Sequence, residues 1–297
     1  MDTEKLRCFI SVVEAGNMAM ASKRLNISQS AISYQIKQLE TELGFPLFVR
    51  SSWKRLSLTS AGRQVYDDTL DFMKAFEKYM QTVSSISNAM EGSLKIATFE
   101  SMAITWLPGI ISVFKEQYPK IQIYVKEGDN AFIEPALVNN TIDFAFTSYR
   151  ERQGIEWIKL AEDPIMAVFP PMHKFGSLAS VPIKYFNEEP FIMSMNLYDY
   201  DVNKVLEDNN ITPRNIICSS QNDHTILQMI ADGLGSSLLY SRILKTINTN
   251  EIVIKPIEPY YSRELGIAVR SFKSASPAAR KFIEITKKWI EKNSPDK

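Results

Sequence analysis

The side chains best suited to molecular recognition lie in one short segment, residues 28–44, which reads SQSAISYQIKQLETELG. Its apolar residues recur at intervals of three and four, as on one face of a helix: Ala31, Ile32, Ile36, Leu39 and Leu43. The remaining positions carry hydrogen-bonding groups rather than catalytic acids, bases or nucleophiles: Ser28, Gln29, Ser30, Ser33, Tyr34 and Lys37. The chemistry that this segment favours is therefore recognition through hydrogen bonds.

Residues that could support catalysis are scarce in the sequence. His173 and His224 are the only histidines, and the sequence has no HExxH, CxxC, GxSxG or P-loop pattern. The run SQNDH brings Ser220, Asp223 and His224 close together, but adjacency in sequence does not provide the geometry of a triad. In ADGLGSSLL the GxG follows a helix, the reverse of a dinucleotide fingerprint, so it indicates helix termination and close packing. We predict a protein that is not an enzyme and holds no metal or cofactor.

The charges are unevenly distributed along the chain, although the total is zero. Up to Arg63 there are nine Lys and Arg against five Asp and Glu, a net of +4; the other residues carry 25 against 29, a net of −4. This asymmetry is expected if only the N-terminal part meets phosphate.

Cysteine usage and hydropathy favour a cytoplasmic protein. Cys8 and Cys218 each lie in an apolar run, which indicates buried free thiols more than a disulfide. The start, MDTEKLRCF, is unlike a signal peptide, and no apolar run approaches the roughly 20 residues needed to cross a bilayer. We therefore expect no membrane partner.

Three helices are predicted before Gly44. Leu6, Phe9, Ile10 and Val13 have helical spacing, and Gly16 fits the position after the first helix. Asn17 can cap the second helix and Ser28 the third, while Asn26 suits the tight turn between them and Ile27 is expected to fill the corner.

Two helices joined by about three residues make a helix-turn-helix, whose second member can enter a DNA major groove about 12 Å wide. Gln29 could pair with an adenine edge, Ser33 could bond a base or a phosphate, and Tyr34 could do either or stack on sugar. The alternative is a solvated face on a small helical bundle.

The segment FPLFVRSSWKRLSLTSAG follows, with Leu47 and Phe48 as expected anchors and LSLT as a short strand. The polar tip between them would form a β-hairpin wing that touches the DNA backbone or minor groove through Arg50, Lys54 and Arg55. A solvated loop is the alternative.

A long helix is predicted from Thr59, its cap, to Met90. An apolar stripe along it has intervals of three, four and seven residues and includes Val65, Phe72, Phe76, Tyr79 and Val83. A helix that projects from a small N-terminal domain (residues 1–58, called the head below) cannot bury such a stripe alone. A second copy of the chain is therefore expected to cover it. Packing on the C-terminal part of the same chain is the alternative.

The combined pattern LRCFISVVEAGNMAMASKRLNISQSAISYQIKQLETELGFPLFVRSSWKRLSLTSAG resembles the N-terminal domain of LysR-type transcriptional regulators. The shared motifs are SQ-x-A-x-S, LE-x-x-LG-x-x-LF-x-R and LT-x-AG, and the resemblance extends over essentially the whole chain. It implies that Gln29, Ser30, Ser33 and Tyr34 face the groove and that Arg50 and Arg55 lie in the wing. Many members have Pro at position 30 and Arg at position 34, and the loss of a cation at position 34 weakens a phosphate or guanine contact.

Strand-like and helix-like runs alternate after residue 91, which predicts mostly parallel sheets covered by helices. The strand-like runs are 94–99, 121–127, 142–148, 164–170, 190–195, 215–220, 236–240 and 264–270. The helix-like runs are 104–117, 131–139, 200–209, 222–232 and a last helix from Ser276.

The resemblance implies that these elements form two α/β subdomains of the periplasmic-binding-protein type. The expected fold is α/β overall, with a winged helix-turn-helix at 1–58, a linker (dimerisation) helix at 59–90 and an effector-binding domain at 91–297. Lobe I would span about 92–161 and 266–297, and lobe II about 162–265, with crossings near Ala161 and Leu265.

Ligands of doubly wound sheets sit beyond the carboxyl ends of the strands, where several polar segments are expected to meet. The candidate effector-binding residues are Glu100, Ser101, Met102, Thr147, Ser148, Met195, Asn196, Asn222 and Asp223. Ordinary capping is the alternative for each. Glu100 and Asp223 would favour a cationic or polyhydroxyl effector.

The expected function is sequence-specific regulation of transcription, modulated by a small-molecule effector. The partners would be double-stranded DNA with an interrupted palindrome, the effector, and further copies in a homodimer or homotetramer. An effector-independent regulator is the alternative, and a cytoplasmic enzyme or solute-binding protein is less favoured.

Overall fold

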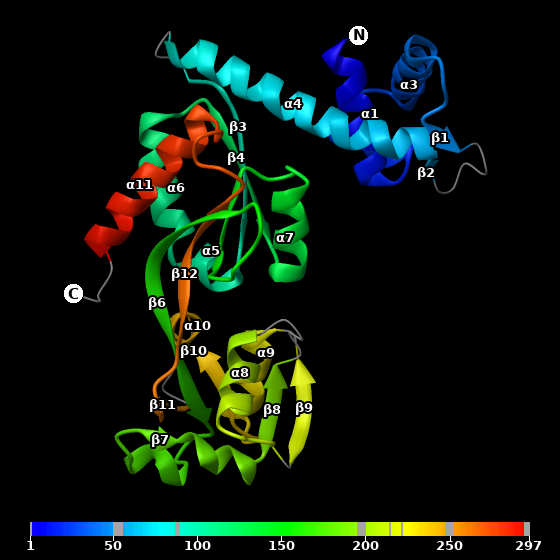
Figure 1. The fold of residues 1–297 in the computed structure, drawn as a ribbon. Helices are drawn as coiled ribbons and strands as arrows, with labels where there is room; N and C mark the ends of the chain where they lie inside the picture. Colours follow the sequence, from blue (N-terminus) through cyan, green and yellow to red (C-terminus); the bar gives the residue numbers. More distant parts are fainter. Residues whose placement is uncertain are drawn as a thin grey trace. The chain divides into compact units, whose positions relative to one another are not determined.

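The computed structural model describes residues 2–49, 56–86, 90–194, 200–213, 215–220, 222–246 and 252–293, and its fold is drawn in Figure 1. Contacts between Cα atoms divide the chain into two compact units, which we describe separately. They are Met1–Gly92 with Asn139–Thr141, and Ser93–Val138 with Ile142–Lys297.

The first unit begins with three helices: α1 (Thr3–Ala15), α2 (Met18–Leu25) and α3 (Gln29–Leu43). They end where the sequence predicts, because Gly16, Asn26 and Gly44 adopt left-handed backbone conformations with φ of 71°, 53° and 82°. The Ser28 hydroxyl caps α3 by accepting a hydrogen bond from the N–H of Ala31 at 3.1 Å.

Apolar side chains from all three helices share one core. Its buried members include Leu6, Phe9, Val12, Ala21, Ile32, Ile36, Leu39 and Leu47. Phe9 is fully buried and meets the rings of Phe48 and Tyr66 edge to face, with centroids 5.7 and 5.9 Å apart. The prediction for Ile27 is wrong, because this side chain is 40% exposed; Leu25, at the end of α2, packs against the core.

Strands β1 (Phe48–Val49) and β2 (Ser57–Leu58) pair antiparallel after α3. The predicted wing-tip residues Arg50, Lys54 and Arg55 lie outside the described residues. Helix α4 (Ser60–Ile86) follows and has 27 residues, so it is about 40 Å long.

The junction between β1 and α4 explains the glycine of the LT-x-AG motif. The Thr59 hydroxyl donates to the carbonyl oxygen of Pro46 at 2.9 Å and accepts from the N–H of Gly62 at 2.8 Å, as a cap does. A Cβ at Gly62 would overlap the carbonyl oxygen of Leu47. Only glycine lets the helix start this close to the strand.

The second unit has two lobes. The strands of lobe I are β3 (Gly92–Thr98), β4 (Ile121–Glu127) and β5 (Phe144–Ser148). Its helices are α5 (Glu100–Thr105), α6 (Leu107–Gln117), α7 (Asn130–Val138) and α11 (Pro277–Asn293). In Figure 1, α6 and α11 lie together on one side of these strands and α7 lies on the other.

Lobe II contains the elements between β6 and β12. Its strands are β7 (Val181–Pro182), β8 (Phe191–Ser194), β9 (Ile216–Ser220), β10 (Ser237–Tyr240) and β11 (Val253–Glu258). Its helices are the short 3₁₀ segments η1 (Lys174–Ser177) and η2 (Ile183–Asn187), then α8 (Tyr200–Asp208), α9 (Asp223–Ala231) and α10 (Ser241–Leu244).

Two long strands run through both lobes: β6 (Glu156–Phe169) and β12 (Ser262–Val269). They pair antiparallel with Ala161 opposite Leu265, and β6 continues into lobe II to pair with β10 and β11. On the lobe I side, β12 pairs with β5.

The prediction of mostly parallel sheets is wrong for the described pairs. The pairs β3–β5, β8–β9 and β7–β11 are parallel, but all four described pairs that involve β6 or β12 are antiparallel. The reason is that the chain crosses between the lobes along two strands of opposite direction, β6 and β12, which places antiparallel neighbours in the 8-stranded sheet that contains both.

Candidate functional site

Helix α3 presents a polar face to solvent. Gln29, Ser30, Ser33, Tyr34 and Lys37 are all exposed, and 62% of Tyr34 is accessible. The structure therefore places these predicted residues on one accessible surface. The predicted contact residue Ser28 is also exposed, but its hydroxyl is engaged as the helix cap and lies 2.9 Å from that of Ser30.

The opposite face of α3 holds the helix in place. Ile32, Ile36 and Leu39 are buried in the core of the head. The Glu40 carboxylate accepts hydrogen bonds from the N–H groups of Leu47 and Phe48 at 2.7 and 3.3 Å, which joins the helix to the start of β1. A rigidly anchored helix with a polar outer face is the arrangement that base recognition requires.

Apolar side chains are exposed along α4. Phe72, Tyr79 and Val83 are 49%, 64% and 45% accessible, whereas Phe76 is half-buried. Val65, the first residue of the predicted stripe, packs against the core of the head instead. Exposed aromatic and branched side chains at helical spacing are typical of an association surface.

Four of the five predicted effector-binding residues of lobe I are buried. Ser101, Met102, Thr147 and Ser148 are at most 5% exposed. The Thr147 hydroxyl donates to Asn130 Oδ1 at 2.8 Å. Thr147 is therefore bonded within lobe I, and Met102 is a core residue.

The other predicted residues have mixed outcomes. Met195 and Asn196 lie outside the described residues. Asn222 caps α9 by accepting from the N–H of Thr225 at 2.9 Å, and its neighbour Asp223 is the first residue of that helix. Glu100 Oε1 lies 3.6 Å from His224 Nε2, so the start of α5 does meet the start of α9.

A buried ionic cluster lies where the lobes meet, and the sequence did not reveal it. Asp163 on β6 is 1% exposed and pairs with Arg263 on β12, whose Nε and Nη2 donate to Oδ2 at 3.1 and 2.8 Å. The backbone N–H of Arg242 donates to the other carboxylate oxygen at 2.8 Å. Asp163 is 79 positions from Arg242 and 100 from Arg263, so no local pattern connects it with them.

A cavity of about 650 Å³ adjoins this cluster. It is lined by Tyr149, Arg150, Glu151, Ile165, Lys204, Val205, Asp208, Tyr261, Ser262, Arg263 and Glu264. The lining comes from the loop after β5, from α8 and from both crossing strands, and it includes none of the predicted effector-binding residues. Its rim carries both signs of charge, while Ile165 and Val205 form a buried apolar floor.

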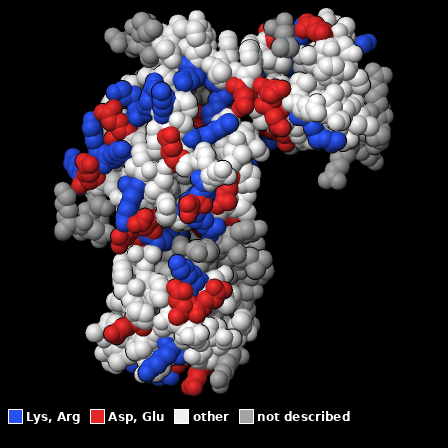
Figure 2. Space-filling view, in the orientation of Figure 1, with Lys and Arg blue, Asp and Glu red and all other residues white. Residues whose placement is uncertain are grey.

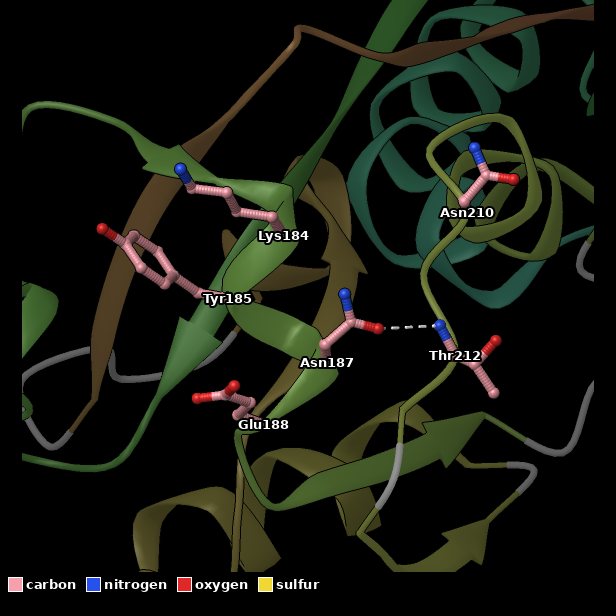
Figure 3. Close-up of a pocket in the computed structure, with 6 residues that line it drawn as sticks. All are labelled: Lys184, Tyr185, Asn187, Glu188, Asn210 and Thr212. Atoms are coloured by element: carbon pink, nitrogen blue, oxygen red, sulfur yellow. Dashed lines mark hydrogen bonds between the residues drawn. The ribbon is translucent and has the colours of Figure 1, made fainter.

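Figure 3 shows a second cavity, of about 490 Å³, on lobe II. Its lining is polar: Lys184, Tyr185, Asn187, Glu188, Asn210 and Thr212. The Asn187 side chain accepts a hydrogen bond from the N–H of Thr212 at 3.0 Å, which ties η2 to the loop after α8. The predicted site residues lie elsewhere.

Lys and Arg side chains gather over α11 in Figure 2. Glu284 lies among them and receives hydrogen bonds from Lys288 and Lys281 at 2.8 and 3.0 Å, which lower the pKa of this carboxyl to about 2. These pairs span three and four residues, so they are the exposed pairs that support a helix.

Other signals have structural explanations. Helix α9 ends at Ala231, Gly233 has a φ of 82°, and a Cβ at Gly235 would lie 2.8 Å from the carbonyl oxygen of Pro190. The GxG therefore ends a helix and allows close packing, as predicted. Cys8 is a buried free thiol, also as predicted.

The described residues contain no group of three or more His, Cys, Asp or Glu side chains arranged to hold a metal ion. No helix in that part of the chain combines the length and the apolar character that crossing a bilayer requires.

Comparisons with known proteins agree with these features. Residues 3–63 match the family model "Bacterial regulatory helix-turn-helix protein, lysR family", and residues 87–291 match "LysR substrate binding domain". The HTH-type transcriptional regulator YvbU of Bacillus subtilis is 28% identical over 97% of this chain and 98% of its own length.

Two solved structures have the same fold. A full-length OxyR variant from Pseudomonas aeruginosa has a TM-score of 0.75, with 22% identity over 98% of this chain and 95% of its own. Full-length CbnR in complex with its target DNA has a TM-score of 0.66, with 21% identity over 97% of this chain and 100% of its own.

Proposed function

Because the chain belongs to the LysR family of transcriptional regulators, we propose that its head reads a specific DNA sequence through the exposed face of α3. The observation that carries this proposal is the contrast between the two faces of that helix. Ile32, Ile36 and Leu39 fix it in the core, while Gln29, Ser33 and other polar residues face solvent. Gln29 would pair with an adenine edge in the major groove.

Phosphate contacts would come from cations around this helix. Lys37 is exposed on α3, and the wing residues Arg50, Lys54 and Arg55 supply the charge that the sequence places beside it. Tyr34 replaces an arginine that many members carry, so its phenol would hydrogen-bond a base or a phosphate, or stack on sugar.

The protein would act as a dimer or a tetramer in the cytoplasm. The exposed side chains of Phe72, Tyr79 and Val83 on α4 would pair with those of a second copy, with Phe76 contributing. Two heads related by a two-fold axis would then dock on the half-sites of an interrupted palindrome. We assign residues 1–58 to DNA binding, 59–90 to dimerisation and 91–297 to effector binding.

The effector would occupy the 650 Å³ cavity between the lobes. Arg150, Lys204 and Arg263 are balanced there by Glu151, Asp208 and Glu264. Such a rim suits a ligand that is zwitterionic or neutral and polar better than one of a single charge. Thr147, which the sequence predicts to bind the effector, does not line this cavity, and its hydroxyl is bonded to Asn130.

The test is binding of purified protein to DNA upstream of its own gene, measured by fluorescence anisotropy. Gln29→Ala should weaken binding to the cognate half-site by about 1–3 kcal/mol and relax discrimination at one base pair. Gln38→Ala, a change to a glutamine of the same helix that is not among the proposed contact residues, is the matched control. Unchanged discrimination in Gln29→Ala would reject the role assigned to this residue.

A further inference from the structure

Arg263 lies where the cavity and both lobes meet. It lines the 650 Å³ cavity, and its side chain is 9% exposed. Two of its nitrogens, Nε and Nη2, hold the buried carboxylate of Asp163 at 3.1 and 2.8 Å. One residue thus belongs both to the wall of the proposed effector site and to the ionic cluster behind it.

The Arg263 guanidinium contacts elements of both lobes. Nη2 also donates to the Ser101 hydroxyl of α5, in lobe I, at 3.3 Å. The guanidinium carbon lies 3.3 Å from the ring centroid of Tyr240 on β10, in lobe II. The lobes therefore share one cation.

Arg242 adds a second bridge between the lobes. Its backbone N–H donates to Asp163, and its guanidinium lies 4.2 Å from the ring centroid of Trp106, at the end of α5. The two contacts place α10 of lobe II against α5 of lobe I. Helix α5 is thus held from the side of lobe II by two arginines.

The contacts of Arg263 differ in strength. The two hydrogen bonds from Nε and Nη2 to Asp163 Oδ2 are charge-assisted and buried, so breaking them would leave two charges without compensation. The bond to Ser101 is long, and its acceptor is an uncharged hydroxyl. A small rotation about the end of the side chain can lose the Ser101 bond while the Asp163 pair persists.

We propose that Arg263 couples occupancy of the cavity to the contact between the lobes. A group that enters the cavity beside Arg263 draws Nη2 away from Ser101 while the Asp163 pair serves as the pivot. This removes one of the two arginine contacts that hold α5 and so loosens α5 against lobe II. Arg263 is therefore a positioning residue for the switch. The inference rests on the proposed function only in taking the cavity as the effector site.

The test fills the cavity covalently, so no effector needs to be known. Asp208→Cys on the cavity wall is labelled with benzyl methanethiosulfonate in a full-length chain that also carries Cys8→Ala and Cys218→Ala. Hydrogen exchange of the amides in Glu100–Thr105 and Ser241–Leu244 is then followed by mass spectrometry. Loss of one hydrogen bond such as that between Arg263 and Ser101 corresponds to a rise of about fivefold in the population of the locally opened state, from which the amides exchange.

We expect the label to speed exchange in both segments about fivefold, and Ser101→Ala to do the same without the label. Adding the label to Ser101→Ala should then change little, because the contact is already lost. The matched control is the same label on Ser112→Cys, an exposed position on α6, which should leave both segments unchanged. Additive effects of label and Ser101→Ala, or unchanged exchange after complete labelling, would overturn the proposal.

DNA binding of the unlabelled variants separates this inference from the proposed function. If the unmodified protein fails to bind DNA, the proposed function fails, but the exchange measurement still decides whether the cavity is coupled to α5. Arg263→Lys keeps the positive charge but lacks the planar guanidinium whose two nitrogens donate to Asp163 and Ser101. It should therefore raise the rate of amide exchange in both segments at least as much as Ser101→Ala does. Exchange as slow as in the unsubstituted chain would count against the assignment.

Discussion

Removal of the Asp163 carboxylate should destabilise the second unit strongly. The carboxylate accepts three N–H groups, two from the Arg263 guanidinium and one from the backbone of Arg242, and it is 1% exposed. Breaking one side of a buried pair costs about 3–5 kcal/mol, because the other charge is left without compensation. Since Arg263 also lines a cavity and can regain water there, we expect Asp163→Ala to fall near 3 kcal/mol.

The assay is urea unfolding followed by tryptophan fluorescence, because Trp106, Trp157 and Trp289 all lie in this unit. Glu162→Gln is the control, since this neighbouring carboxylate is exposed and pairs with the exposed Lys159. The double variant Asp163→Ala/Arg263→Met should lose less stability than the two single changes add up to. A loss below about 1 kcal/mol in Asp163→Ala would refute the reasoning, because a buried charge would then have cost almost nothing.

Further predictions concern the first unit. Gly62→Ala should cost about 1–3 kcal/mol in thermal unfolding, because its methyl group would overlap the Leu47 carbonyl oxygen, and equal stability to Ser60→Ala would contradict this. Val83→Glu should shift the oligomer toward monomer in analytical ultracentrifugation, and an unchanged distribution would remove α4 as the dimer contact. Burial raises the pKa of Tyr66 from 10.0 to about 12, so the folded head retains a proton that the unfolded chain releases. The head should lose stability as pH rises from 10 to 12, and circular dichroism should show a smaller loss in Tyr66→Phe.

The head was predictable because its signals are local. Gly16, Asn26 and Gly44 each mark a position where the chain must turn with a positive φ, and Ser28 lies at the cap of the helix that follows. The buried faces follow from residues three and four apart. Ile27 fails because the direction of an apolar side chain in a turn depends on packing against the rest of the head, which the local pattern does not specify.

The crossing strands were harder to predict because their signal is not local. The first half of β6, Glu156–Asp163, mixes charged and apolar residues, and it is a strand because β12 pairs with it from about 100 residues away. Tertiary pairing here overrides local preference. The same long separation hides the partnership of Asp163 with Arg263.

The ends of the predicted strands located the polar segments of lobe I, but they did not show what these residues do. Thr147 lies near the carboxyl end of β5, which pairs parallel with β3, and this is a place where a ligand-binding residue is expected. Its hydroxyl instead bonds Asn130, which also accepts from the Arg152 guanidinium at 3.1 Å. The Arg152 side chain is only 9% exposed, so it needs hydrogen-bond acceptors within the protein. Its bond to Asn130 therefore favours a structural role for Asn130, and also for the Thr147 hydroxyl that donates to the same oxygen. Ser101 differs because its partner, Arg263, reaches it from a strand that also lines the cavity. A polar residue at a strand end is therefore best assigned by asking whether its partner belongs to the same lobe.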